Sequence, residues 1–424
     1  MLDIKHIFEN KETVKNKLNL RGFNTKIIDE IYKKGKDLGK IKFEIQNLQS
    51  DVTKKSKEIS LNIKDSKKVE KIKEEILKIK EQIFQKNEKF EQLNSFILKE
   101  MLLIPNLPLD DVPVGNSEEE NVVISTHEKL GRGLVKQEIS HSDIAHDLGI
   151  IDLPRAVKMS GSRFVIYKND GAKLVRALQW FMLEEHISRG YEEYNIPLLV
   201  KSQMLKGTGQ LPKFEEDLFK IANEDLYLIP TAEVSLTNVW NNEILNLDDP
   251  IKVTAFSECF RSEVGSGGKD NKGIIRNKQF KKVELVKIVK EEDIKHEFEK
   301  TLDDAKNILE KLEIPYRELL LCTGDLGFSS EQTIDLELWM PSENKFREVS
   351  SVSRFGDFQG RRAMIRYKNG KENKYAFTIN GSGLAIDRLI AAIIENGYNK
   401  EDGSVSIPKA LISYMQIDKI TKRK

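Results

Sequence analysis

The sequence predicts a mixed α/β fold with a largely antiparallel sheet, preceded by two long helices that fold back on each other. Two observations support this prediction. Residues 27–100 contain no proline and carry aliphatic side chains in a heptad pattern, and the chain beyond residue 113 alternates helical stretches with short strands and turns. With 424 residues, the chain is long enough for two or three domains with sizeable cores.

The heptad region predicts an antiparallel two-helix arm, because the polar stretch LNIKDS (61–66) separates two aliphatic seams. The seams consist of Ile31, Leu38, Ile41, Ile45, Leu48, Val52 and Ile59, and of Val69, Ile72, Ile76, Ile79, Ile83, Phe90, Leu93 and Ile97. A helix of this length extends roughly 50 Å. Residues 26–100 hold nineteen lysines, no arginine and fourteen acidic residues, a net charge of +5. This charge fits either a solvated coiled-coil surface or a rod that binds a polyanion.

Three prolines in MLLIPNLPLDDVP (101–113) end the helical region and indicate a linker. We therefore expect an N-terminal domain at residues 1–104 with the arm at about 27–100, a linker at 105–120, and a larger domain at 121–424.

A strand, a glycine-rich loop and a second strand are predicted between residues 252 and 289. KVTAFSECF (252–260) and FKKVELVKIV (280–289) have strand composition, with Arg261 at the end of the first. The period of two places Arg261 and Glu263 on one face. Seven basic and two acidic residues lie between positions 260 and 282, which indicates a phosphate site. Taken alone, Arg261 and Glu263 fit a surface cross-strand pair equally well.

A second predicted hairpin joins IDLELWM (334–340) to REVSSVS (347–353), with Glu348 and Ser350 on one face and Val349 and Ser351 on the other. The stretch TINGSGLAIDRLIAAIIENG (378–397) then reads as a strand, a glycine turn and an apolar helix that carries Arg388. An arginine in such a helix needs an anionic partner, which is either a ligand or a structural carboxylate.

Composition excludes several classes of protein. The net charge is +1, so any affinity for nucleic acid must come from local patches. Two cysteines, Cys259 and Cys322, are too few for a disulfide framework or a four-thiolate zinc site, and a reducing compartment is expected. His141 and His146 are five residues apart, which does not stack two ligands on one helix face. No apolar run has the length of a membrane span, and neither zinc nor a membrane is expected.

The order of these features resembles that of class II aminoacyl-tRNA synthetases. Arg261 at a strand end followed by an acidic Glu-x-x-Ser strand and GSGLAIDR resembles motifs 2 and 3, and GYEEYNIPLLV (190–200) resembles the dimer-forming motif 1. The arm together with SGSRF, GTGQLPKFEEDLF, LIPTAEV, TGDLGFSS and DFQGRR resembles the bacterial type of seryl-tRNA synthetase, over essentially the whole chain.

The resemblance implies that L-serine is activated with ATP and Mg²⁺ to seryl-adenylate and then transferred to serine tRNA. The residues that it implies for catalysis are Arg261, Glu263 and Arg388. Those that it implies for serine are Thr231, Ala232, Glu233, Arg261, Glu284 and Ser382. Those that it implies for ATP are Arg261, Ser262, Glu263, Arg276, Phe280, Glu348, Val349, Ser350, Ser351 and Arg388, with Glu348 and Ser351 also holding the magnesium.

The resemblance further implies that the arm binds the long variable arm of serine tRNA, that the chain forms a homodimer and that it is cytoplasmic. Whether selenocysteine tRNA is also a substrate stays open. Two alternatives remain, a synthetase paralogue that charges no tRNA and a coiled-coil scaffold. Asp387 departs from the family pattern, and we expect its carboxylate to weaken the grip of Arg388 on phosphate.

Overall fold

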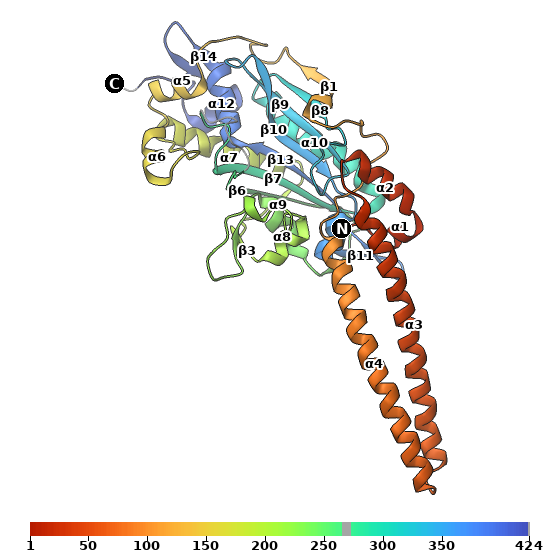
Figure 1. Cartoon of the computed structure of the whole chain (residues 1–424). Helices are drawn as coiled ribbons and strands as arrows, with labels where there is room; N and C mark the ends of the chain where they lie inside the picture. Colours follow the sequence, from red (N-terminus) through yellow and green to blue (C-terminus); the bar gives the residue numbers. More distant parts are fainter. Residues whose placement is uncertain (265–272, 423–424) are drawn as a thin grey trace. The chain divides into compact units, whose positions relative to one another are not determined.

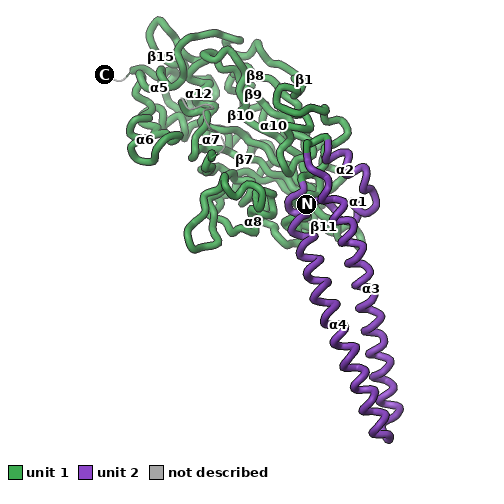
Figure 2. The backbone as a smooth tube through the Cα atoms, viewed as in Figure 1, with its two compact units in different colours: residues 1, 20–22, 105–424 green, residues 2–19, 23–104 purple. Residues whose placement is uncertain are grey.

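A computed structural model describes residues 1–264 and 273–422. The chain divides into two compact units, of which the first comprises residues 1, 20–22 and 105–424 and the second residues 2–19 and 23–104 (Figure 2). Each unit has its own apolar interior, and we describe the two separately.

The second unit is a long helical hairpin with two short helices at its base. It contains α1 (Ile4–Glu9), most of α2 (Lys11–Leu20), α3 (Lys26–Leu61) and α4 (Ser66–Met101). Figure 1 shows α3 and α4 side by side along their length. Every predicted seam residue is buried or half-buried, and the carboxylate of Asp65 caps α4 by accepting from the amide of Lys68. The predicted two-helix arm is therefore confirmed.

Charged pairs cross between the two helices of the hairpin. Lys55 Nζ lies 2.5 Å from a carboxylate oxygen of Glu75, and Lys86 Nζ lies 2.6 Å from one of Glu44. Both pairs join positions that are symmetric about residue 65, as the antiparallel register requires. Because these groups are partly open to solvent, we expect them to specify register more than stability.

Two glycines of α3 have different surroundings. A Cβ added at Gly35 would lie 2.1 Å from the ring of Phe8, whereas one at Gly39 would meet no heavy atom within 4 Å. Gly35 thus admits the ring of Phe8, which also lies 5.4 Å from the ring of Tyr32. Gly39 has no such packing role.

The first unit is built on an eight-stranded sheet. In spatial order the strands are β1 (Val122–His127), β8 (Tyr316–Leu320), β9 (Gln332–Met340), β10 (Lys345–Arg354), β13 (Phe377–Ala385), β7 (Gln279–Val289), β6 (Ile251–Phe260) and β2 (Glu192–Glu193). All neighbours are antiparallel except β2 and β6. The sequence prediction of a largely antiparallel sheet with these two hairpins is confirmed. At the edge strand β1, Val122, Val123 and Ile124 are exposed.

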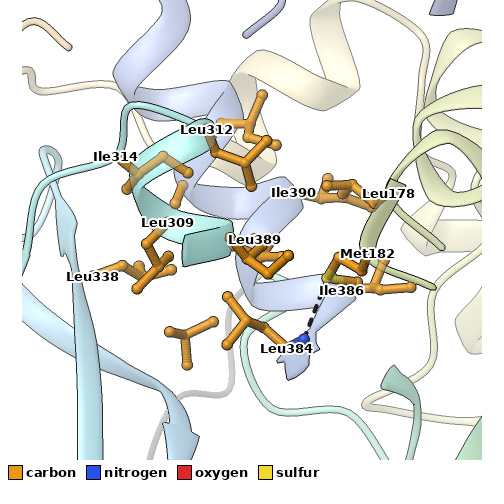
Figure 3. Close-up of a cluster of buried hydrophobic side chains, with 14 of the residues drawn as sticks. Leu178, Met182, Leu309, Leu312, Ile314, Leu338, Leu384, Ile386, Leu389 and Ile390 are labelled. Carbon is orange, nitrogen blue, oxygen red and sulfur yellow. Dashed lines mark hydrogen bonds between the residues drawn. The ribbon is translucent and has the colours of Figure 1, made fainter. Parts of the chain in front are cut away.

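Three helices cover one face of the sheet: α7 (Asp170–Ser188), α10 (Ile294–Lys311) and α12 (Ile386–Gly397). Successive strand residues point to opposite faces, so the aliphatic residues at alternate positions meet these helices. Leu338 of β9, Leu309 of α10 and Leu389 of α12 belong to this core (Figure 3). The amide of Leu384 also lies 3.2 Å from the sulfur of Met182 there.

The opposite face of the sheet is polar and forms the floor of a cleft. α8 (Ser202–Thr208) and α9 (Ala232–Thr237) lie beside it, and α9 packs on β6 and β7 through a separate apolar cluster that includes Val234, Val253 and Val286. A sheet with one apolar and one polar face thus both anchors the helices and presents a row of functional groups.

The remaining elements surround this sheet. They are α5 (His141–Asp147), α6 (Leu153–Ser160), α11 (Phe358–Ala363), α13 (Lys409–Met415), β3 (Leu199–Val200), β4 (Tyr227–Leu228), β5 (Ile244–Leu245), β11 (Arg366–Asn369), β12 (Glu372–Tyr375), β14 (Tyr398–Asn399), β15 (Ser404–Ser406) and β16 (Lys419–Ile420). Within residues 1–264 and 273–422, every helix is too short or too polar to span a bilayer.

Candidate active site

The polar face of the sheet opens into a cleft of about 990 Å³. Four neighbouring strands contribute side chains to it. These side chains are Lys282 and Glu284 from β7, Ser382 from β13, Glu348 and Ser351 from β10, and Asp335 and Glu337 from β9. The alternation of the strands explains why these polar residues sit between core residues in the sequence.

A bulge in β10 corrects one prediction. The regular alternation predicted Glu348 with Ser350 on one face and Ser351 on the other. Instead, the register shifts between Glu348 and Ser350, so that Glu348 pairs with Glu337 and Ser351 with Asp335. The extra residue, Val349, re-aims the strand, as β-bulges do. As a result Glu348 and Ser351 both line the cleft.

The turn after β6 corrects a second prediction. The strand ends at Phe260, and Glu263 has φ of +56°, so Arg261 and Glu263 do not share a strand face. Glu263 instead accepts from Arg276 Nε at 2.6 Å and lies 3.9 Å from Arg163 Nη1. The glycine-rich loop predicted between the strands lies largely outside the described residues.

Arg261 and Phe280 mark one end of the cleft. The guanidinium carbon of Arg261 lies 5.1 Å from the centre of the Phe280 ring, within cation–π range. A smaller cavity of about 70 Å³ adjoins the main cleft there, lined by both residues and by Glu263, Arg276 and Arg388 among others. With the described residues, Arg261 forms no ion pair. Its charge is therefore available to an anion.

Arg388 reaches the cleft from the first turn of α12. Its Nη1 donates to the carbonyl of Glu348 at 2.6 Å and lies 3.3 Å from the Glu348 carboxylate. This guanidinium lowers the pKa of Glu348. Burial, and then the nearby Glu348, raises the pKa of Asp335, whose carboxylate accepts a hydrogen bond from Ser351. Glu348 is therefore the more readily ionised of these two neighbouring carboxyl groups, and Asp335 the less.

Asp387 precedes Arg388 in the first turn of α12. Its carboxylate accepts from the hydroxyl of Tyr167 at 2.6 Å and from the amide of Lys281 at 2.7 Å. Burial raises the pKa of this group. Because both oxygens are engaged, Asp387 ties the start of α12 to β7 while Arg388 contacts Glu348. The side chain of Asp387 is thus held by Tyr167 and Lys281, and its effect on phosphate binding by Arg388 stays a prediction.

A buried polar pocket lies farther along β7. Thr231 Oγ1 donates to Glu284 at 2.6 Å and accepts from Lys282 Nζ at 3.0 Å, and Lys282 forms an ion pair with Glu284. The Thr231 hydroxyl also accepts from the amide of Glu233, where α9 begins. Glu233 accepts from Gln359 Nε2 at 2.6 Å. The pocket thus combines one lysine with two carboxyl groups.

Glu233 is the group of this pocket whose pKa is clearly shifted. Burial, with a further contribution from the charge of Glu284, raises the pKa of Glu233 to about 7, against the opposing hydrogen bond from Gln359. A cationic ligand strongly stabilises the ionised form of such a buried carboxyl group, because the ligand replaces the hydration that burial removed.

Three predicted residues direct their side chains away from the described part of the cleft. Ala232 packs in the apolar cluster beneath α9, Ser262 donates to the carbonyl of Glu216, and Ser350 donates to the carbonyl of Ser382. The other predicted residues line one or both cavities: Thr231, Glu233, Arg261, Glu263, Arg276, Phe280, Glu284, Glu348, Val349, Ser351, Ser382 and Arg388.

Sequence reasoning missed three participants. Lys282 lies two positions before Glu284 on one strand, so its face was predictable although its pairing with Glu284 was not. Asp335 comes opposite Ser351 only through the register of the bulged hairpin. Gln359 lies on α11, 126 positions from Glu233 in the chain, and no local pattern identifies it.

The donor set at Glu348 and Ser351 is suited to a hard cation. It offers a carboxylate and a hydroxyl, with Asp335 behind, and oxygen ligands of this kind suit Mg²⁺ that completes its shell with phosphates and water. Among the residues that the structure describes, no three His, Cys, Asp or Glu side chains are arranged to hold a metal by themselves.

Taken together, three guanidinium groups, those of Arg261, Arg276 and Arg388, line the cleft beside an aromatic ring and a polar pocket. Residues 214–397 match the tRNA synthetase class II core domain (G, H, P, S and T), and residues 1–108 match the seryl-tRNA synthetase N-terminal domain. The fold is that of a class II aminoacyl-tRNA synthetase.

Comparison with known proteins identifies the family within this class. The serine–tRNA ligase of Mycoplasmopsis agalactiae is 52% identical over 99% of this chain and 100% of its own, and that of Metamycoplasma arthritidis is 54% identical over 98% of each. The crystal structure of seryl-tRNA synthetase from Pyrococcus horikoshii complexed with ATP has a TM-score of 0.94 at 36% identity and covers 100% of both chains. The chain belongs to the seryl-tRNA synthetase family, the serine–tRNA ligases, which confirms the resemblance found in the sequence.

Proposed function

We propose that this chain joins L-serine to serine tRNA through a seryl-adenylate formed in the cleft. The observation that carries the proposal is the continuity of the two parts of the site: the pocket of Thr231, Glu233 and Glu284 opens into the same cleft as Arg261. An amino acid held in that pocket would direct its carboxylate toward the arginine, where the α-phosphate of ATP is also expected.

In the first step, a carboxylate oxygen of serine bonds to the α-phosphorus of ATP, the bond from that phosphorus to the bridging oxygen breaks, and pyrophosphate leaves. The protein supplies alignment and positive charge rather than a nucleophile. Arg261 bridges the α-phosphate and the serine carboxylate, and Arg276 and Arg388 hold the outer phosphates. Phe280 stacks on adenine, and Glu263 accepts from the adenine amino group, aided by the backbone of Ser262.

In the second step, a hydroxyl of the 3′-terminal ribose attacks the activated carbonyl carbon and AMP leaves. On the serine side, Thr231 and Glu233 bind the ammonium group, with Ala232 holding the turn between them. Glu284 and Ser382 form hydrogen bonds with the serine hydroxyl. A cationic ligand beside Glu233 fits the raised pKa of this carboxyl group.

Magnesium would be held by Glu348 and Ser351, with the backbone of Val349 and Ser350 shaping the strand beneath it. It supplies charge neutralisation to the phosphates when bound. The bulge supports this assignment, because it brings both oxygen donors to the cleft.

We propose three parts of the chain: an N-terminal domain at residues 1–104, a linker at 105–120 and a catalytic domain at 121–424. The N-terminal domain binds the long variable arm of serine tRNA through its two-helix arm. The lysine-rich surface of the arm supports contacts to phosphate. Selenocysteine tRNA, where a host makes it, shares this substrate class, and charging of its transcript by the purified protein tests this extension.

We further propose a homodimer that acts in the cytoplasm. Trp180 and Ile187, seven residues apart on α7, are 62% and 39% exposed and directly precede the motif 1-like segment 190–200. Exposed apolar side chains beside this segment suit a subunit interface. Light scattering at micromolar concentration should give twice the chain mass, and a monomer mass contradicts the proposal. The two buried cysteines are free, which suits a reducing compartment.

Exchange of labelled pyrophosphate into ATP tests the proposed function. Exchange should require serine, and alanine should support it roughly 10⁴-fold less well, because buried hydrogen-bonding groups then lack their partner. Exchange without charging of tRNA would favour the paralogue. Absence of exchange with every amino acid would favour the scaffold.

A further inference from the structure

His141 and Glu395 form a buried pair outside the residues assigned to substrates. The imidazole Nδ1 lies 2.8 Å from a carboxylate oxygen of Glu395, and the two side chains are 7% and 0% exposed. Glu395 also accepts from the amide of His141 at 2.9 Å, and from the amide and hydroxyl of Ser342 at 2.9 and 2.8 Å. Burial opposes ionisation of Glu395, but these hydrogen bonds together lower its pKa.

The second nitrogen of His141 reaches the chain that enters the ATP side of the cleft. Because the Glu395 carboxylate accepts from Nδ1–H, the lone pair of Nε2 is free to accept the amide of Ile274, which lies at 3.3 Å. The contact is close, since a Cβ added at Gly273 would lie 2.2 Å from this nitrogen. His141 therefore links α5, α12 and the segment that leads to Arg276.

The helix α12 holds this segment at two successive residues. Glu395 and Arg388 are seven positions apart, about two turns, and so share one stripe of the helix. Arg388 Nε donates to the carbonyl of Ile275 at 3.3 Å, while Glu395 acts on the amide of Ile274 through His141. Arg276 is the next residue in the chain, and its Nε lies 2.6 Å from a carboxylate oxygen of Glu263.

We propose that His141 and Glu395 are positioning residues that fix Ile274 and thereby set Arg276 for the outer phosphates of ATP. The inference rests on the proposed use of ATP by this site. Within the described part of the chain, the residues proposed for serine, Thr231, Glu233 and Glu284, form no hydrogen bond or ion pair with either member of the pair. Loss of the pair should therefore weaken the binding of ATP and leave the binding of serine unchanged.

Four variants test this division: His141→Phe, His141→Gln, His141→Asn and Glu395→Gln. The matched control is His146→Gln, an exposed histidine on the same helix. His141→Phe should raise the KM for ATP in pyrophosphate exchange about five- to tenfold, the loss expected for one buried hydrogen bond. The KM for serine should change less than twofold, and the control should match the parent.

The two amide variants separate positioning from mere packing. The glutamine oxygen can reach the place of Nε2 and accept from Ile274, so His141→Gln should recover part of the ATP KM. The shorter asparagine keeps only the contact to Glu395 and should not. Recovery by asparagine equal to that by glutamine, an unchanged ATP KM in His141→Phe, or equal effects on both substrates would each overturn the proposal. If His141→Phe does not fold, the comparison of the two amides decides.

Direct titration with ATP separates this inference from the proposed function. The dissociation constant for ATP should follow the KM in every variant. A parent protein that binds ATP but exchanges no pyrophosphate with serine would refute the proposed function and leave the role of the pair to be decided by these ATP dissociation constants.

Discussion

Glu233 is a carboxyl group whose pKa is shifted by its surroundings in a direction that a substrate can reverse. It is buried beside Glu284, and its pKa of about 7 lies above the ordinary value because burial and the like charge both disfavour ionisation. A bound ammonium group would stabilise the ionised form. Serine binding at neutral pH should therefore release a proton.

We expect serine affinity to fall as the pH falls, because the proposed ligand for the ammonium becomes protonated. For a pKa of about 7, the apparent dissociation constant for serine should rise about tenfold between pH 8 and pH 6. Isothermal titration in two buffers of different ionisation enthalpy measures both the affinity and the proton release. Glu233→Gln should bind serine weakly and without this pH dependence, and a parent profile as flat as that of the variant would contradict the role.

Arg261 and Arg388 differ in how far the protein already neutralises them. Arg388 lies 3.3 Å from the carboxylate of Glu348, whereas Arg261 contacts the ring of Phe280 and forms no ion pair with the described residues. Arg261→Ala should therefore lower the rate of pyrophosphate exchange by about 10² to 10³, and more than Arg388→Ala does. Near-normal exchange by Arg261→Ala would remove Arg261 from the proposed step.

At the scale of elements, the hairpin of β9 and β10 separates what a pattern can predict from what it cannot. The alternation in IDLELWM and REVSSVS predicted both strands and their turn, because apolar residues must reach the core at every second position. The bulge at Val349 was not predicted, since its signal is a register shift rather than a residue type. That single residue determines that Glu348 and Ser351 face the same cleft.

The two glycines of α3 offer a matched pair of substitutions in one helix. Gly39→Ala should stabilise the helix by about 0.5–1 kcal/mol, because alanine restricts the unfolded chain and meets nothing. Gly35→Ala should destabilise it by about 1–3 kcal/mol, because the new methyl group displaces the ring of Phe8. Amide hydrogen exchange in residues 31–45 of the full chain measures both effects, and the same sign for both would show that Phe8 does not pack on Gly35.

At the scale of the whole molecule, the sequence predicted most of the fold and most of the proposed site residues. Strong periodicity made the arm and the strands predictable, and most of the site residues proposed from the order of motifs line the two cavities. The turn at Glu263 and the engagement of Asp387 by Tyr167 were not predictable, because both depend on contacts between segments distant in sequence or on a positive φ. The contact of Gln359 with Glu233 was not predicted for the same reason, since the two residues are distant in sequence.

The arm can be shortened without changing its register. Removal of residues 48–61 and 69–82 deletes two heptads from each helix and keeps the turn at residues 62–65. The register is kept because cross-helix pairs such as Lys55 with Glu75 are symmetric about residue 65. The hairpin then loses about 21 Å of reach. Serine-dependent pyrophosphate exchange should stay within a few-fold of the parent, since every residue proposed for ATP and serine lies after residue 230.

Charging of serine tRNA by the shortened protein should fall by orders of magnitude, and tRNA binding should lose part of its salt dependence. An unchanged rate of charging would show that the arm is only a solvated coiled coil. A variant in which exchange also fails would show instead that the arm supports the folding of the rest of the chain.

The outer strand of the large sheet bears on how the protein behaves when it is concentrated. Val122, Val123 and Ile124 of β1 are each 44–46% exposed. Among the strands that the structure describes, β1 has a neighbour on one side only, the arrangement through which separate molecules add strands to one another and precipitate. Three glutamates, Glu118–Glu120, end one residue before this strand, and their repulsion between molecules opposes such stacking. Salt shortens the range of that repulsion. Purified material should therefore remain clear longer at low ionic strength than at high, and Ile124→Lys should remove the difference.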